Sequence, residues 1–175
     1  MADYCFYIVG VGGTGSLLAR DLPQLLLQYR NHSMVLIDGD VVERRNLIRQ
    51  RFQPGDVGMN KAIAMANKIN SFYPVECEAM DVYLTDKELL ARIGISEAIP
   101  VIIGCVDNNA TRLILENTYK ELKTAVYIDS ANSAYSGNVF CSVKSNGKYY
   151  GKTRKQAKQL KQKDRNPAEL SCMER

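Results

Sequence analysis

The sequence predicts an α/β fold, a Rossmann-like and mostly parallel sheet with helices on both faces and an antiparallel extension. The apolar segments 34–37 and 100–106 are continuous, as in parallel strands that are buried on both faces. Segments with helical periodicity alternate with such strands along the chain, which is the order of βαβ units. The segment 137–143 instead alternates apolar and polar residues, which is typical of a half-exposed antiparallel strand.

The size and composition of the chain limit the class of protein. The chain has 175 residues, which is the usual size of one domain. No run approaches the roughly 20 apolar residues that cross a bilayer, and the first strand begins without a basic segment and an apolar signal core. We therefore expect a cytoplasmic protein with no membrane partner.

Cysteine and histidine chemistry is not favoured. The five cysteines form no Cys-x-x-Cys pair, so neither a disulfide framework nor a zinc site is indicated. Most of them should be small apolar residues in strands. The one histidine, His32, lies in a polar segment, where we expect a solvated loop side chain.

A glycine-rich loop follows the first expected strand, 5–9. Its glycines are Gly10, Gly12, Gly13 and Gly15. Glycine in such a loop permits positive φ angles and lets a phosphate approach the backbone amides at a helix N-terminus. The pattern is shared by NAD, flavin and S-adenosylmethionine sites, and it also occurs where a helix packs closely on a strand without any ligand.

A dense polar loop, 38–50, follows the second expected strand. Its candidate site residues are Asp38, Asp40, Asn46, Arg49 and Gln50. Asp38 lies at the tip of the strand, 23 residues after Gly15, where a carboxylate accepts hydrogen bonds from ribose hydroxyls. A nicotinamide or methyl-donor site does not require the amide and arginine side chains that follow. Arg49 instead favours a polyphosphate, whose charge a guanidinium neutralises.

Helices and strands continue to alternate through the rest of the chain. We expect helices at 16–29, 61–70, 85–93 and 110–122, and strands at 75–80, 100–106 and 125–128. Pro23 either kinks the first helix or starts it anew. Lys61 opens the second helix, where the helix dipole disfavours a cation, so either solvent or an anion must compensate it.

The strand 100–106 ends next to Asp107 and Asn108. The carboxyl ends of parallel strands are where open α/β sheets bind ligands. Asp107 either caps the helix that follows or binds magnesium. Both functions are open from the residues alone.

Charge is concentrated near the C-terminus. Residues 144–165 contain seven lysines and two arginines against Asp164, a local charge of +8, and the total of +4 leaves −4 for the rest. We expect a mobile loop or an exposed helix around 156–163, and a turn with a helix start at 166–172. The predicted division is a nucleotide-binding domain, 1–143, followed by a basic mobile or crossover segment and an incomplete C-terminal part, 144–175.

Taken together, four motifs resemble those of the ThiF/MoeB superfamily, the adenylating domains of ubiquitin-activating enzymes and their bacterial relatives. They are Gly10-x-Gly12-Gly13-x-Gly15, Asp38-x-Asp40-x-Val42 with Asn46-Leu47-x-Arg49-Gln50, Gly58-x-x-Lys61, and Asp107-Asn108 with Arg112. The resemblance covers residues 6–143. Within the superfamily, the segments Gly-Gly-Thr-Gly-Ser and Gly-Cys-Val-Asp-Asn are most similar to the ThiF-like proteins of the PRTRC gene system.

The resemblance implies an adenylating enzyme that uses ATP and Mg²⁺. The acyl group would come from the C-terminus of a ubiquitin-like or sulfur-carrier protein. The implied nucleotide-binding residues are Gly10, Gly12, Gly13, Gly15, Asp38, Asp40, Asn46, Arg49, Gln50, Lys61 and Asn108. The implied catalytic residues are Arg49, Lys61 and Asp107, of which Asp107 would bind the magnesium ion. Cations suffice for this chemistry because the barrier comes from the negative phosphate oxygens.

The chain departs from the superfamily pattern at three points. No helix precedes the first strand to supply a second arginine to a homodimer partner, no zinc-binding cysteine pairs are present, and only Cys172 lies where a thioester-forming cysteine is found. Adenylation of a small-molecule or RNA-borne carboxylate is therefore an alternative, as is a non-catalytic nucleotide-binding module. A nicotinamide-linked oxidoreductase is disfavoured by Arg49, Lys61 and Asp107 together.

Overall fold

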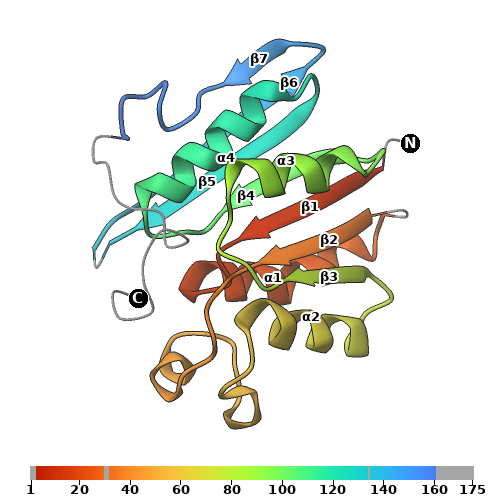
Figure 1. Cartoon of the computed structure of the whole chain (residues 1–175), viewed down its shortest axis with the longest axis vertical. Helices are drawn as coiled ribbons and strands as arrows, with labels where there is room; N and C mark the ends of the chain where they lie inside the picture. Colours follow the sequence, from red (N-terminus) through yellow and green to blue (C-terminus); the bar gives the residue numbers. More distant parts are fainter. Residues whose placement is uncertain (1–2, 30–31, 134, 161–175) are drawn as a thin grey trace.

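A seven-stranded sheet forms the centre of the computed structural model, which describes residues 3–29, 32–133 and 135–160. Helices cover both faces of this sheet (Figure 1). The strands are β1 Tyr4–Val9, β2 His32–Ile37, β3 Glu76–Met80, β4 Ile99–Gly104, β5 Ala125–Asn132, β6 Gly137–Ser145 and β7 Lys148–Gly151. The α-helices are α1 Gly13–Leu26, α2 Lys61–Phe72, α3 Asp86–Gly94 and α4 Asn109–Glu121, and the 3₁₀-helices are η1 Arg44–Ile48 and η2 Pro54–Asp56.

The strand order, β3-β2-β1-β4-β5-β6-β7, confirms the predicted α/β fold. The first five strands are parallel, and β6 and β7 add the antiparallel extension. The chain moves outward in one direction from β1 to β3 and in the other from β4 onward. The loops that follow β1 and β4 therefore diverge, which opens a crevice at this switch point.

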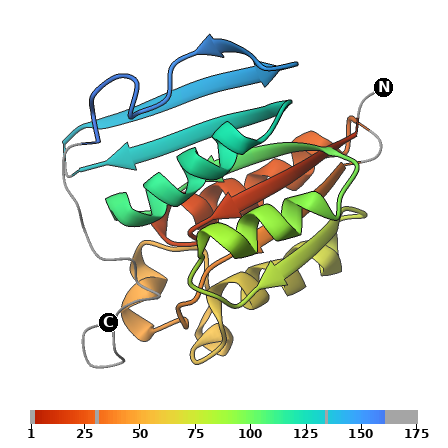
Figure 2. The same ribbon diagram turned by 45° about the horizontal axis from the view of Figure 1, so that its top comes forward.

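Two hydrophobic cores lie on opposite faces of the sheet. Helices α1 and α2 pack with one core, and α3 and α4 with the other (Figure 2). Neighbouring residues of β1 alternate between them, since Ile8 lies in the first core and Tyr7 and Val9 in the second. Both faces of the central strands are thus buried, which explains their continuous apolar sequence.

The elements at the start of the chain differ in detail from the prediction. Helix α1 begins within the glycine loop, at Gly13, and contains Pro23 in its interior. The expectation of a solvated loop at His32 is wrong, because this residue begins β2. Its Nδ1 accepts a hydrogen bond of 3.3 Å from the backbone amide of Tyr4, so its ring belongs to the packing at the end of the sheet.

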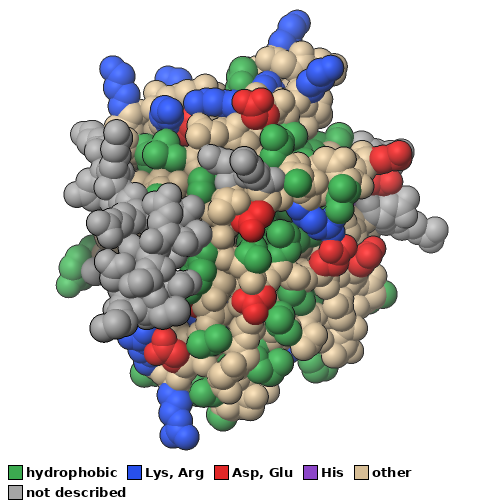
Figure 3. All heavy atoms as spheres, in the orientation of Figure 1, with side chains coloured by type: hydrophobic (Ala, Val, Ile, Leu, Met, Phe, Trp, Pro, Cys, Tyr) green, Lys and Arg blue, Asp and Glu red, His purple; other side chains and the backbone are tan. Residues whose placement is uncertain are grey.

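The first residues of the basic segment, 144–151, belong to a β-hairpin. Strand β6 continues to Ser145, and the pair Asn146-Gly147, with φ angles of 48° and 81°, turns the chain into β7. Two positive φ angles are typical of a tight hairpin turn. The lysine and arginine side chains gather over this hairpin (Figure 3). The expected helix start at 166–172, with Cys172, lies outside the described residues.

The cysteines in the described part of the chain mostly follow the prediction. Cys5 in β1 and Cys77 in β3 are buried, Cys105 directly follows β4, and Cys141 in β6 is exposed. Among the described helices, none is both long enough and apolar enough to cross a membrane.

Candidate functional site

A cavity of about 930 Å³ lies at the carboxyl ends of the parallel strands, at the switch point between β1 and β4. The predicted site residues that line it are Gly10, Gly12, Gly13, Asp38, Asp40, Arg49, Gln50, Lys61, Asp107 and Asn108. They come from three loops and from the first residue of α2, which are far apart in the sequence. Gly15 and Asn46, which are also predicted site residues, lie outside the lining.

The four glycines of the first loop serve two different purposes. Gly10 has a φ of +87°, and a Cβ added to Gly15 would lie 1.8 Å from the carbonyl oxygen of Gly10, so packing of the loop on α1 requires both. A Cβ on Gly13 would meet no atom within 4 Å. Gly12 is the N-cap of α1 and provides no side-chain cap. The helix therefore presents backbone amides beside the cavity, as in anion sites at helix N-termini.

Asp38 joins the glycine loop to the acidic loop. Its Oδ2 accepts a hydrogen bond of 2.6 Å from the backbone amide of Val11, and its Oδ1 accepts one of 2.9 Å from that of Asp40. Burial raises the pKa of this carboxyl, and the two backbone amides and Lys61 oppose the rise. A carboxylate can accept about four hydrogen bonds, so Asp38 keeps acceptor sites for further donors.

Lys61 is paired with an anion of the chain itself. Its Nζ lies 2.7 Å from Oδ2 of Asp40, and its side chain is 9% exposed. The hydroxyl of Tyr83 donates a hydrogen bond of 2.6 Å to Oδ1 of the same carboxylate. The ring of Tyr83 lies so close to Gly39 that an added Cβ would meet it at 2.6 Å. Tyr83 lines the cavity, and no motif in the sequence singles it out.

The three polar residues of the acidic loop have different environments. Asn46 belongs to the capping box of η1, whose N-cap is Glu43, since its Oδ1 accepts a hydrogen bond of 2.8 Å from the backbone amide of Glu43. Arg49 is exposed at the rim of the cavity and makes no ion pair with the residues that the structure describes. The Oε1 of Gln50 is buried without a hydrogen-bond partner there. Arg49 and Gln50 are therefore available to a ligand, and the side-chain oxygen of Asn46 already has a partner.

Asp107 is not the cap of α4. Asn108 is the cap, because its Oδ1 accepts a hydrogen bond of 2.8 Å from the backbone amide of Thr111. The side chain of Asp107 is exposed on the cavity and forms no ion pair within the described ranges. No group of three or more metal-ligating side chains occurs in that part of the chain. A single carboxylate still fits magnesium, which commonly binds one or two carboxylates together with substrate phosphates.

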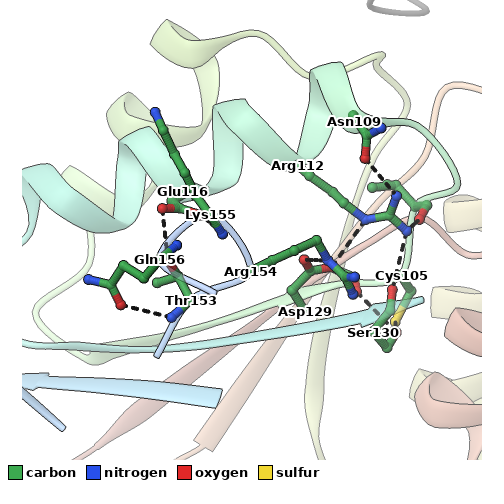
Figure 4. A network of polar contacts seen from close by, with 12 residues as sticks. Cys105, Asn109, Arg112, Glu116, Asp129, Ser130, Thr153, Arg154, Lys155 and Gln156 are labelled. Atoms are coloured by element: carbon green, nitrogen blue, oxygen red, sulfur yellow. Dashed lines mark hydrogen bonds and ion pairs between the residues drawn. The ribbon is translucent and has the colours of Figure 1, made fainter. Parts of the chain in front are cut away.

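A buried network of charges joins α4, β5 and the turn after β7 (Figure 4). Arg112 of α4 lines the cavity, donates to the backbone carbonyl of Val106, and places its Nε 3.2 Å from Oδ1 of Asp129. Arg154, which follows β7, places its Nε 2.5 Å from Oδ2 of the same carboxylate. Asp129 has no exposed surface. The sequence places Arg112 in a motif, but the interaction between Arg154 and Asp129 has no sequence signal.

Comparisons with known proteins agree with this geometry. The sequence profile of the ThiF family matches residues 2–173. Ubiquitin-like modifier-activating enzyme 5 of Rattus norvegicus is 33% identical over 147 residues, which are 78% of this chain and 36% of that protein. The enzyme of the same name from Oryza sativa subsp. japonica is 26% identical over 149 residues, 78% of this chain and 34% of that protein.

Solved structures share the fold. The structure of the E. coli tRNA N6-threonylcarbamoyladenosine dehydratase, TcdA, has a TM-score of 0.61 at 24% identity, covering 71% of this chain and 50% of that chain. A second structure of TcdA contains AMP, and its TM-score is 0.60 at 23% identity, over 71% of this chain and 49% of that chain. The chain thus spans about a third of the length of the curated relatives and half of the TcdA chain. The finer resemblance to the PRTRC proteins stays a prediction.

Proposed function

The chain belongs to the ThiF family, and from this premise we propose that it is an ATP- and magnesium-dependent adenylyltransferase of the ubiquitin-activating-enzyme type. The names of the curated relatives support activation of a ubiquitin-like modifier. The AMP in the TcdA structure supports a nucleotide in the corresponding fold. We take residues 1–143 as the ATP-binding domain and 144–175 as the segment that contacts the acyl substrate.

One observation carries the proposal, the placement of Arg49, Lys61 and Asp107 around a single cavity at the switch point. The negative charge of a triphosphate complements the positive charges of Arg49 and Lys61. Mg²⁺ bound to a triphosphate brings the cation that matches the carboxylate. We assign the ribose to Asp38, and the phosphates to Arg49, Lys61 and the amide groups of the glycine loop.

The reaction that fits these groups transfers AMP to a carboxylate. A carboxylate oxygen attacks the α-phosphorus of ATP and forms an acyl-phosphate bond. The bond from that phosphorus to the bridging oxygen breaks, and the oxygen leaves with pyrophosphate. Both steps move negative charge without a proton transfer, so Arg49 and Lys61 act by electrostatic stabilisation. A bound magnesium ion adds charge neutralisation on the phosphate oxygens.

For the acyl substrate we propose the C-terminal carboxylate of a ubiquitin-like or sulfur-carrier protein. A flexible C-terminal tail can reach a cavity that opens between loops, and the names of the curated relatives favour this class. A homodimer that supplies a further arginine is compatible with the exposed rim of the cavity. Adenylation of a small-molecule or RNA-borne carboxylate, and nucleotide binding without catalysis, are the alternatives.

The test is ATP–pyrophosphate exchange in the presence of a candidate ubiquitin-like protein, with Asp107→Ala and Arg49→Ala beside the wild type. We expect both substitutions to reduce exchange by about 100-fold or more, the order that a lost electrostatic group costs. Arg51→Ala is the matched control, since Arg51 is exposed two residues away and lies outside the cavity lining. Undiminished exchange in the two site variants, or an equal loss in the control, contradicts the assignment.

RNA binding distinguishes the main alternative, an RNA-borne carboxylate, from a protein substrate. Binding that weakens steeply with salt, and is lost when the exposed residues Lys148, Lys152 and Lys155 are changed to alanine, favours an RNA-borne substrate. Tight ATP binding without exchange against any tested carboxylate favours the non-catalytic module.

A further inference from the structure

The turn that follows β7 supplies partners to two buried carboxylates. Glu116 of α4 is 1% exposed. Its Oε1 accepts a hydrogen bond of 2.8 Å from the hydroxyl of Thr153, and its Oε2 accepts one of 3.3 Å from the backbone amide of Lys155. Asp129, the second carboxylate, accepts a hydrogen bond of 2.5 Å from Nε of Arg154. Because buried charges need partners, this turn is an integral part of the fold.

Arg154 is held from two sides in this turn. Its side chain is 6% exposed, and its guanidinium lies 4.8 Å from the centre of the Phe140 ring. The Nη2 of Arg154 is buried without a hydrogen-bond partner in the described part of the chain. The guanidinium therefore binds Asp129 through Nε alone, and this leaves Oδ1 of Asp129 to Arg112.

Arg112 connects Asp129 to the loop that lines the cavity. Nε of Arg112 takes Oδ1 of Asp129, while its Nη2 donates to the carbonyl of Val106, the residue directly before Asp107. A guanidinium prefers to bind a carboxylate with two parallel hydrogen bonds. Arg154 shares the charge of Asp129 by binding Oδ2, while Arg112 binds Oδ1 through Nε alone and keeps Nη2 for the carbonyl oxygens of Val106 and Ser130.

We propose that Arg154 is a positioning residue for Asp107, acting through Asp129 and Arg112. Without Arg154, Arg112 turns to bind both oxygens of Asp129 and releases the carbonyl of Val106. The carbonyl of Val106 then loses its hydrogen bond from Arg112, and the carboxylate of Asp107 is held less well for a cation. The identity of that cation, Mg²⁺ on ATP, rests on the proposed function, but the attachment of the loop does not.

Docking of the turn and binding at Asp107 are then coupled, and linkage requires the coupling to be reciprocal. Mg²⁺ with ATP at the cavity should protect the turn against hydrogen exchange. The backbone amides of Ala157 and Gln159 report on this protection, since they bond to the carbonyls of Thr153 and Arg154.

The experiment compares the whole chain with Arg154→Met and Arg154→Lys, and with Lys152→Ala as the matched control. Lys152 is exposed in the same segment, so the control removes one positive charge without touching Asp129. Titration calorimetry measures ATP binding with Mg²⁺ and with a chelator. Hydrogen exchange measures the peptide that contains residues 105–108, with and without ligand. Arg154→Lys keeps the positive charge, and it serves as the test variant if Arg154→Met does not fold.

We expect Arg154→Met to weaken ATP binding about tenfold with Mg²⁺ and less than about threefold with the chelator, a coupling of the size seen between adjoining networks. Hydrogen exchange at 105–108 should be faster in Arg154→Met than in the wild type even without ligand. Arg154→Lys should give values between those of the wild type and Arg154→Met. Equal losses with and without Mg²⁺, unchanged exchange at 105–108, or the same losses in Lys152→Ala overturn the proposal. A wild type that binds no ATP refutes the proposed function, while the exchange of the unliganded loop still decides on the positioning of Asp107.

Discussion

Replacing Asp40 by asparagine should destabilise the free protein and strengthen its binding of a triphosphate. Asp40 is the anion that Lys61 contacts, at 2.7 Å, and the two side chains are 51% and 9% exposed. Breaking a fully buried ion pair costs about 3–5 kcal/mol, and an exposed one contributes about 0–1 kcal/mol. With one partner in each environment, we expect a loss of about 1–2 kcal/mol, or about 2–8 °C in Tm for a chain of this size.

The same substitution removes a competitor of the ligand. In the wild type, a phosphate that binds Lys61 must displace or share the Asp40 carboxylate. In Asp40→Asn, the lysine has no such anion, so the affinity for ATP should rise by about 5- to 30-fold, the equivalent of the 1–2 kcal/mol lost on folding. Increasing salt should reduce the difference only partly, because Lys61 is shielded from solvent.

Thermal unfolding and titration calorimetry with ATP test both parts. Asp21→Asn is the control, because Asp21 forms an exposed pair with Arg20 on α1 and should change neither Tm nor affinity. Weaker ATP binding in Asp40→Asn would refute the reasoning, since Asp40 would then assist the ligand. An unchanged Tm would show that the pair contributes nothing to stability.

The remaining predictions concern single positions. Gly15→Ala should prevent folding, because the new methyl group would lie 1.8 Å from the carbonyl oxygen of Gly10. In Gly13→Ala the methyl group would meet no atom within 4 Å, so this variant should fold but bind ATP more weakly. Circular dichroism measures the folding of each variant, and titration measures its ATP binding. Burial raises the pKa of the Cys77 thiol to about 12, so the folded state retains this proton more tightly than the unfolded chain. Stability is therefore fully present below about pH 9 and falls toward pH 12, and Cys77→Ala should show a shallower fall in urea unfolding between about pH 8 and about pH 11. Cys141 is exposed, so Cys141→Ser should remove one fast-reacting thiol equivalent in a titration with a disulfide reagent, and an unchanged fast phase would contradict its exposure.

The central part of the fold could be predicted because a strand that is buried on both faces has a continuous apolar sequence. The apolar run in β4 has few other interpretations, and the glycine loop, helix and acidic strand end follow in the order of a nucleotide-binding unit. The antiparallel edge was harder. Strand β7 is exposed at each of its residues, so it has no buried face that would produce an apolar pattern in the sequence. The pair Asn146-Gly147 was the available signal for the hairpin.

The site could be predicted residue by residue where a side chain directly follows a strand, as Asp38 and Asp107 do. It could not be predicted where one residue type has two uses. Asn108 caps α4 and Asn46 belongs to the capping box of η1, although an amide in a nucleotide loop can equally well contact phosphate. Contacts between distant segments were also out of reach, because Arg154 and Tyr83 gain their partners only when the sheet is assembled.

The charges of the cavity distinguish between the ligands that a glycine loop can bind. Both oxygens of Asp38 accept backbone hydrogen bonds, and Asp40 is paired with Lys61. Asp107 and Arg49 lack ion-pair partners within the described ranges. A dinucleotide places its pyrophosphate at the glycine loop and has no group that needs the carboxylate of Asp107. In the proposed function, a triphosphate with Mg²⁺ would present anionic oxygens to Arg49 and a cation to Asp107, and would thus neutralise both charges in one binding event.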